Sequence, residues 1–210
     1  MLKRGDIEFM EQNFKIFLEG VKNTYPKLKV EQAEVTETHI LEIEEKMEIQ
    51  FNDELKKWFQ LIGNAKYGVD GFLSGMEIYS VDEMFEEWKS WREFDNDKIL
   101  NDAQYYSSKP EGAIKCRYTN PKWIPLGHDY ASNYIGVDLD PDMNGIIGQV
   151  INFGRDENDK KVFANSIKEY LELLIRNQDE MMISEEDNGD YYINEDGIHA
   201  IDWLKKKSTN

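Results

Sequence analysis

Apolar residues near the start of the chain recur three or four positions apart, which is the spacing of one face of an α-helix. They are Ile7, Met10, Phe14, Phe17, Leu18 and Val21. Pro26 is expected to end this helix, because proline lacks the backbone N–H that a helix interior requires. We therefore predict an amphipathic N-terminal helix that packs onto the rest of the protein.

The next stretch contains three well-marked helix starts. Thr36, Asn52 and Ser80 each precede a run with helical apolar spacing, and all three are residue types that cap helix N-termini. Ser80 and Glu83 also match the Ser-x-x-Glu capping box. A weaker helical pattern covers residues 97–106. The first half of the chain is therefore predicted to be helical.

After Pro110 the pattern changes to short runs rich in Ile, Val, Tyr and Phe, which predict strands. The runs are 112–118, 122–126, 133–139, 146–153 and 160–163. They are too close together for helical crossovers, so the sheet should be mainly antiparallel. Ser166 and Glu169 form a second capping box, for a closing helix. The predicted class is α+β, with N-terminal helices packed around a mainly antiparallel curved sheet and a closing C-terminal helix.

The charge pattern divides the chain into three parts. Residues 1–34 carry six basic and six acidic side chains and are predicted to form a neutral helical extension. Residues 35–177 form the main domain. Residues 178–210 form an acidic C-terminal extension, in which apolar residues between the carboxylates predict a strand and a short helix docked on the domain.

The composition narrows the possible partners. Acidic residues outnumber basic ones by 42 to 25, which gives a net charge of −17. Nucleic acids and anionic membranes are not expected to bind, since binding to phosphate relies on Lys and Arg. A basic protein partner would be attracted by this charge. High solubility is the simpler explanation of the same composition.

The sequence favours a cytoplasmic protein. The single cysteine, Cys116, excludes an intramolecular disulfide and a cysteine-rich zinc site, and we expect it to be buried within a strand. Acidic residues interrupt the N-terminal segment where a signal peptide would be apolar. No stretch approaches the ~18 consecutive apolar residues of a membrane-spanning helix.

One segment resembles a calcium-binding loop. Residues 140–145, Asp-Pro-Asp-Met-Asn-Gly, match the first six positions of an EF-hand loop. The twelfth position, which requires a bidentate Glu, is Ile151. We therefore predict an acidic turn between two strands, with Gly145 at a positive φ angle, and no metal site.

No arrangement of residues indicates an enzyme or a bound cofactor. The three histidines lack metal-ligand spacing. No glycine-rich phosphate-binding motif is present. His128 is followed by Asp129, but no nucleophile motif accompanies the pair. A hydrolase that uses Asp138, Asp140 or His128 is the least favoured alternative.

Aromatic residues give the strongest indication of a binding surface. Most are expected in the core, but Trp91 and the Tyr105–Tyr106 pair lie near several acidic residues. These acids are Glu86, Glu87, Glu93 and Asp95. An exposed aromatic ring surrounded by carboxylates could bind an Arg-rich partner.

Two segments resemble the SUKH superfamily, the Smi–Knr type of domain. The first is VTETHILEIEEKMEIQFNDELKKWFQLIGNA, residues 35–65, and the second is KWIPLGHDYASNYIGVDLDPDMNGIIGQVINF, residues 122–153. With the closing helix, the resemblance covers residues 35–177. It departs from the family pattern at Phe51-Asn52, where Leu-Pro is usual, and at Gly63-Asn64, where the order is reversed. The positions that match are Trp123, Pro125, Gly127, Asp138, Gly145 and Gly148.

The resemblance implies a non-catalytic binding module, and the family offers two functions. Bacterial members are immunity proteins that neutralise polymorphic toxins, whereas yeast members regulate cell-wall glucan synthesis. The net charge of −17 favours an immunity protein that blocks a basic, nuclease-type toxin with an acidic face. An intracellular regulator or scaffold of cell-wall synthesis is the alternative. The expected partner contacts lie outside the core, on the third capped helix and on the acidic turn: Glu86, Glu87, Trp91, Asp138, Asp140 and Asp142.

Overall fold

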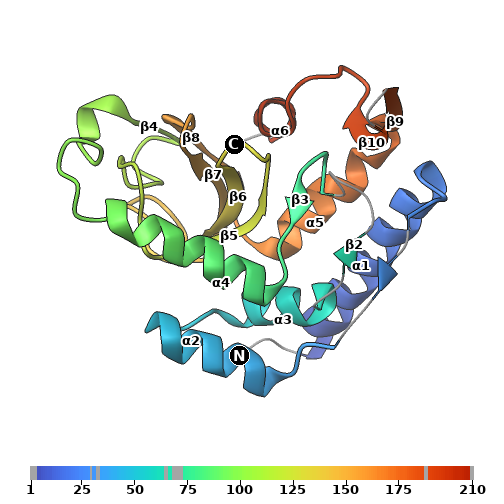
Figure 1. The fold of residues 1–210 in the computed structure, drawn as a ribbon, viewed down its shortest axis with the longest axis horizontal. Coiled ribbons are helices and arrows are strands. Elements are labelled where there is room, and N and C mark those ends of the chain that lie inside the picture. Colours follow the sequence, from blue (N-terminus) through green and yellow to red (C-terminus); the bar gives the residue numbers. More distant parts are fainter. Residues whose placement is uncertain are drawn as a thin grey trace.

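Helices and a mainly antiparallel sheet form this protein, which is therefore of the α+β class (Figure 1). The computed structural model describes residues 4–28, 30–31, 34–63, 66–67, 73–186 and 189–208. Within these residues, no helix is long and apolar enough to cross a membrane.

Four helices begin at the residues that the sequence predicts. The helices are α1 (Arg4–Thr24), α2 (Glu37–Met47), α3 (Asp53–Ile62), α4 (Val81–Ser90), α5 (Ile167–Arg176) and α6 (Ala200–Lys207). The side chains of Thr36, Asn52 and Ser166 accept hydrogen bonds from backbone N–H groups in the first turns of α2, α3 and α5. At α4, Ser80 and Glu83 form the complete capping box. These caps satisfy N–H groups that have no partner within the helix.

A six-stranded sheet lies at the centre, in the order β3-β5-β6-β7-β8-β4. Its strands are β3 (Glu77–Ile78), β4 (Ser107–Lys109), β5 (Trp123–His128), β6 (Asn133–Asp138), β7 (Gln149–Gly154) and β8 (Asp159–Ala164). Neighbouring strands are antiparallel, except for β4, which runs parallel to β8. Two small antiparallel pairs join β1 (Val30–Glu31) to β2 (Lys66–Tyr67) and β9 (Met181–Glu186) to β10 (Gly189–Asn194).

The prediction of a strand at residues 112–118 is wrong. This segment is a loop, and Cys116 within it is half-buried rather than enclosed in a strand. The carbonyl of Ala113 accepts hydrogen bonds from the backbone of Asp142 and the side chain of Gln149. The polar groups of this segment are thus used by the connection between β6 and β7, not by a neighbouring strand.

The predicted helix at residues 97–106 is also wrong. The segment forms turns that end in a short 3-10 helix, η2 (Ala103–Tyr105). The Asp97 side chain accepts backbone hydrogen bonds from Ile99 and Leu100, and Asp102 caps η2. Such local bonds from Asp compete with helix formation.

The hydrophobic core extends from the first helix to the last. One cluster of buried residues includes Phe14 of α1, Trp58 of α3, Trp123 of β5, Tyr170 of α5 and Trp203 of α6. Helix α5 contacts β7 and β8 and also packs against α1 and α3, so it lies between the sheet and the N-terminal helix (Figure 1). The division at residues 34 and 177 stays a prediction.

Candidate functional site

The predicted contact residues fall into two groups that one segment connects. Glu86, Glu87 and Trp91 lie on α4 or directly after it, and the three aspartates lie at the end of β6 and beyond. The Trp88 indole on α4 donates a hydrogen bond of 2.6 Å to the carbonyl of Pro121. The neighbouring Asn120 amide donates one of 3.0 Å to Asp140. We call residues 139–148, which join β6 to β7, the β6–β7 turn.

On α4, the Glu87 carboxylate is directed at the sheet, and its contact with a partner stays a prediction. The Tyr134 hydroxyl donates a hydrogen bond of 2.5 Å to Glu87 Oε1, and the Trp91 indole donates to the same hydroxyl at 2.9 Å. Burial and the Glu87 carboxylate together raise the pKa of Tyr134 above its usual value. Glu87 therefore orders the α4–β6 contact and is half-buried.

Trp91 is held in an aromatic cluster. Its ring packs edge-on against Tyr134 and Phe94, with centroid distances of 5.5 Å and 5.8 Å, and lies 5.3 Å from the Tyr118 ring. The cavity between this cluster and the sheet measures about 10 Å³, which holds at most one water molecule. The cluster is therefore a packed support and has no room for a small-molecule ligand. Whether Trp91 contacts a partner stays a prediction.

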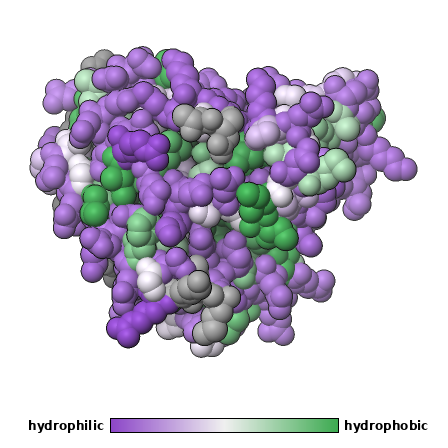
Figure 2. Space-filling model, turned by 180° about the vertical axis from the view of Figure 1, so that it is seen from behind, coloured by the Kyte–Doolittle hydropathy of each residue, from purple (hydrophilic) through white to green (hydrophobic). Residues whose placement is uncertain are grey.

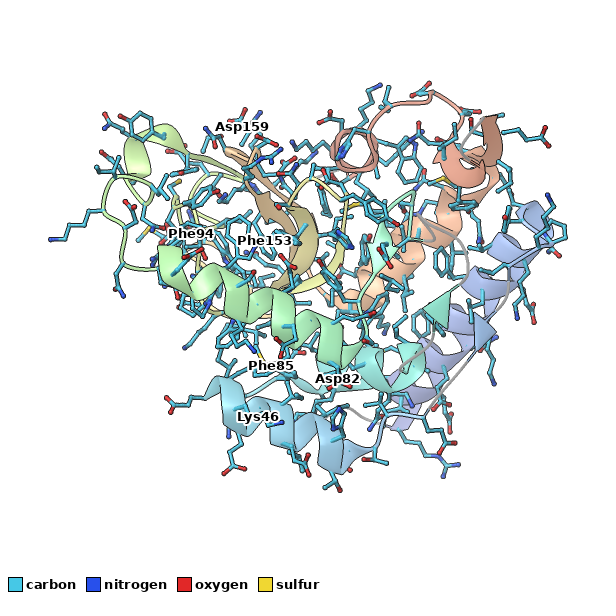
Figure 3. All side chains as sticks on the ribbon, in the orientation of Figure 1. Lys46, Asp82, Phe85, Phe94, Phe153 and Asp159 are labelled. Atoms are coloured by element: carbon cyan, nitrogen blue, oxygen red, sulfur yellow. The ribbon has the colours of Figure 1, made fainter. Side chains whose placement is uncertain are left out.

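The carboxylates of α4 do not form a row of unpaired charges. Glu86 is exposed and forms an ion pair of 2.7 Å with Lys89, and Glu83 is used by the capping box. Asp82 binds His39 of α2 at 2.9 Å. Figure 3 shows Asp82 and Phe85 on the side of α4 that faces α2, where Lys46 lies over the Phe85 ring. Most carboxylates of the acidic face predicted on this helix thus have partners within the chain.

The expectation that Asp138 lies outside the core is wrong. Its side chain is fully buried, because β6 is enclosed on both faces and Asp138 ends it. One carboxylate oxygen accepts the backbone N–H of Asp140 at 2.9 Å, and the other accepts the Gln149 amide at 2.9 Å. Burial raises the pKa of Asp138 to about 6. This carboxylate anchors the β6–β7 turn.

Asp140 and Asp142 lie on the turn itself. Asp140 forms an ion pair of 2.6 Å with Lys115. Burial acts to raise the pKa of Asp140, but the hydrogen bonds from Lys115 and Asn120 prevail and lower it. Asp142 is exposed, and its carboxylate accepts the backbone N–H of Met143. Asp142 is thus the aspartate of the three that a partner can reach most directly.

Three apolar residues of the turn were missed by the sequence analysis. Met143 is 87% exposed, Ile147 67% and Ile146 52%. We call these three side chains the turn apex. Both isoleucines were predicted in a strand because their β-branched side chains favour one, but β7 begins only at Gln149. The sequence signal for a turn before the strand was the glycine at position 148, which adopts a φ of +97°.

Gly145 has a different role from the one predicted. It is absent from the residues with positive φ. A Cβ atom at this position would overlap the Ala113 carbonyl and the Pro141 side chain, so the glycine permits a close approach of two loops. The twelfth position of the calcium-like motif, Ile151, is buried in β7. Among the described residues, no group of three or more His, Cys, Asp or Glu side chains could hold a metal ion.

The sequence matches the model of the SMI1 / KNR4 family (SUKH-1) over residues 34–173, which include α2 to α4 and the six-stranded sheet. The "Cell wall biosynthesis/cell cycle regulator smi1" of Schizosaccharomyces pombe is 34% identical over 131 residues, covering 56% of this chain and 26% of the relative. The "Glucan synthesis regulatory protein" of Neurospora crassa is 27% identical over 187 residues, covering 73% of this chain and 35% of the relative.

A third relative is the "Cell wall assembly regulator SMI1" of Saccharomyces cerevisiae. It is 28% identical over 169 residues, covering 65% of this chain and 34% of the relative. The chain thus spans about a quarter to a third of the length of these curated relatives. Helix α4 and the β6–β7 turn lie within the region that the family shares, whereas α1 and α6 lie outside it.

Proposed function

Because this chain belongs to the SMI1 / KNR4 family (SUKH-1), we propose that it is a non-catalytic protein-binding module that regulates cell-wall assembly. The observation that carries this proposal is the set of relatives. All three relatives described above are named as regulators, and each name refers to the cell wall or to glucan synthesis. The family resemblance found in the sequence is confirmed.

The relatives favour the regulator over the toxin inhibitor that the charge suggested. None of the three relatives is named for immunity. The net charge of −17 fits a basic protein partner in either function. A neighbouring gene for a secreted protein with a nuclease-like domain would instead support immunity. We place the action in the cytoplasm, where the single unbridged cysteine would remain reduced.

The polar groups of the hydrolase alternative all have partners within the chain. Asp138 is buried and bonded to Gln149, and Asp140 is paired with Lys115. His128 binds Glu77 at 3.1 Å and stacks on Tyr79. These side chains therefore have structural partners, and a catalytic pair would need one of them oriented toward a substrate. The names of the relatives agree with a regulator rather than an enzyme.

The proposal can be tested by replacing a domain of the Saccharomyces cerevisiae relative. The segment of that protein that aligns with this chain is exchanged for the full 210-residue chain. We expect the chimera to restore growth on a cell-wall-binding dye and a normal wall glucan content in cells that lack the relative.

Two variants control for folding and expression. Trp58→Asp places a charge at a fully buried position and should abolish rescue. Met182→Ser changes an exposed side chain outside the family region and should preserve it. A chimera that is expressed at the level of the native relative, yet grows like the deletion strain, would contradict the proposed function.

A further inference from the structure

The turn apex exposes three large aliphatic side chains within five residues of one another. Single exposed apolar residues are common on protein surfaces, but clustered ones indicate contact sites. Met143, Ile146 and Ile147 are each more than half exposed. The rest of the surface is mostly hydrophilic, as Figure 2 shows for one face, where apolar residues form only separate patches. The apex is therefore a local exception that packing within this chain does not explain.

Hydrogen bonds tie the turn that carries the apex to residues 112–113 and to the start of β7. Its backbone N–H groups at Asp142 and Asn144 donate to the carbonyls of Ala113 and Gly112, at 3.2 Å and 2.9 Å. The N–H of Ile146 donates to Gln149, whose amide is in turn bonded to the buried Asp138. An apolar surface that is already ordered loses little conformational freedom when a partner binds. This geometry suits a docking site.

The charges around the apex define the chemistry of the partner. The turn contains two acidic residues and no basic one. Lys115 pairs with Asp140, and Lys122 also lies near it, so the exposed carboxylates of the two adjoining loops are Asp142 and Glu111. In the described part of the chain, neither of these two carboxylates has an ion pair. Asn144 binds the Glu111 carbonyl, so the two loops stay together.

We propose that the turn apex is the docking site for a protein segment that presents apolar side chains flanked by Lys or Arg. The inference rests on the proposed protein-binding function and names the surface and the partner chemistry. A second copy of this chain is a poor occupant, because each copy carries a charge of −17 and the two would repel. An anionic membrane would be repelled for the same reason.

Random 12-residue peptides displayed on phage provide a defined probe. Peptides are selected on the full wild-type chain, synthesised, and titrated by calorimetry at 50 mM and 300 mM salt. We expect selected peptides to combine apolar residues with Lys or Arg. Met143→Ser/Ile147→Ser should weaken binding at least tenfold, which corresponds to about 1.4 kcal/mol. Asp142→Lys should reduce the salt dependence of the affinity.

The matched control exchanges side chains of the same types elsewhere. Ile16 on α1 and Met182 on β9 are 40% and 46% exposed, and both lie outside the β6–β7 turn. Ile16→Ser/Met182→Ser should change the affinity less than twofold. Circular dichroism and melting curves establish that both double variants fold.

Several outcomes would overturn the inference. Peptides that bind the apex variant as tightly as wild type, or a selection that yields no peptide dependent on the apex, would exclude the turn as a docking site. Apex-dependent dimerisation in sedimentation would identify a second copy as the occupant. Apex-dependent binding to phosphatidylcholine/phosphatidylserine vesicles would identify a membrane. The domain exchange described above tests the regulatory function separately, so rescue by the apex variant would reject the docking site and leave that function intact.

Discussion

Replacing Asp138 by asparagine tests whether this carboxylate is as deeply buried as the structure places it. Burial raises its pKa from 3.8 to about 6, so the folded chain binds a proton at this site more readily than the unfolded chain. At 1.36 kcal/mol per pKa unit, this difference in pKa amounts to about 3 kcal/mol against the ionised form at pH 7. Asp138→Asn removes this electrostatic cost.

The same substitution has an opposing effect on hydrogen bonding. The Gln149 amide donates to Asp138 at 2.9 Å, and an asparagine Nδ2 in place of that carboxylate oxygen cannot accept it. Gln149 cannot simply rotate its amide, because its oxygen accepts the N–H of Ile146 and its nitrogen also donates to the Ala113 carbonyl. Leaving one buried donor without a partner costs about 1–3 kcal/mol at any pH. Near pH 7 the variant should therefore be as stable as wild type or more stable, by up to about 2 kcal/mol.

The pH dependence separates the two effects. Because the folded-state pKa of this carboxyl is raised, its contribution to wild-type stability is most favourable below pH 3.8 and declines as the pH rises toward about 6. Relative to wild type, Asp138→Asn should gain about 1.4 kcal/mol between pH 5 and pH 8. Urea unfolding of dilute protein, followed by tryptophan fluorescence, measures this difference above the pI of about 4.6.

Asp142→Asn is the matched control, because Asp142 is exposed. Its stability relative to wild type should vary by less than ~0.5 kcal/mol over the same pH range. If the free-energy difference between Asp138→Asn and wild type stays constant from pH 5 to pH 8, Asp138 does not titrate as a buried carboxyl. Asp138 would then not be the buried carboxylate that anchors the β6–β7 turn.

Three further substitutions test the site. Gly145→Ala should lower the free energy of unfolding by about 1–3 kcal/mol or more, because the new Cβ would overlap the Ala113 carbonyl. Urea unfolding measures this change, and equal stability of variant and wild type would refute the close approach. Tyr134→Phe should cost about 1 kcal/mol, because Glu87 loses the hydroxyl donor while the Trp91 indole keeps its hydrogen bond of 3.1 Å to Glu87 Oε1. An unchanged melting temperature would contradict the contribution of the hydroxyl. Burial lowers the pKa of Lys160 to about 8, whereas its pKa in the unfolded chain is 10.5. The folded chain therefore loses this proton first, and the free energy of unfolding of wild type should increase as the pH rises from 8 to 10.5. Lys160→Met should lack that rise. If calorimetry shows the same pH dependence of stability for the variant and for wild type, the pKa of Lys160 is not lowered by burial.

The sequence by itself determined the helix starts and the central strands. Thr36, Asn52, Ser80 and Ser166 cap helices with their own side chains, an interaction that spans only two or three residues and is therefore visible in a local pattern. Residues 122–126 and 133–139 were predicted as strands and correspond to β5 and β6. Their enrichment in large apolar residues reflects burial on both faces of the sheet. The family was recognisable because these elements follow one another in a fixed order.

Only the tertiary structure decided which polar and apolar residues of the candidate site face outward. Asp138 reads as part of an acidic turn, yet it is buried because Gln149 and the backbone of Asp140 supply the hydrogen bonds that its carboxylate needs. Ile146 and Ile147 have the composition of a strand, yet they are exposed because bonds from the turn to residues 111–113 hold the chain away from the sheet. Apart from the nearby Asp140 backbone, these partners lie 11 to 36 residues apart in the sequence, so no local pattern could reveal them.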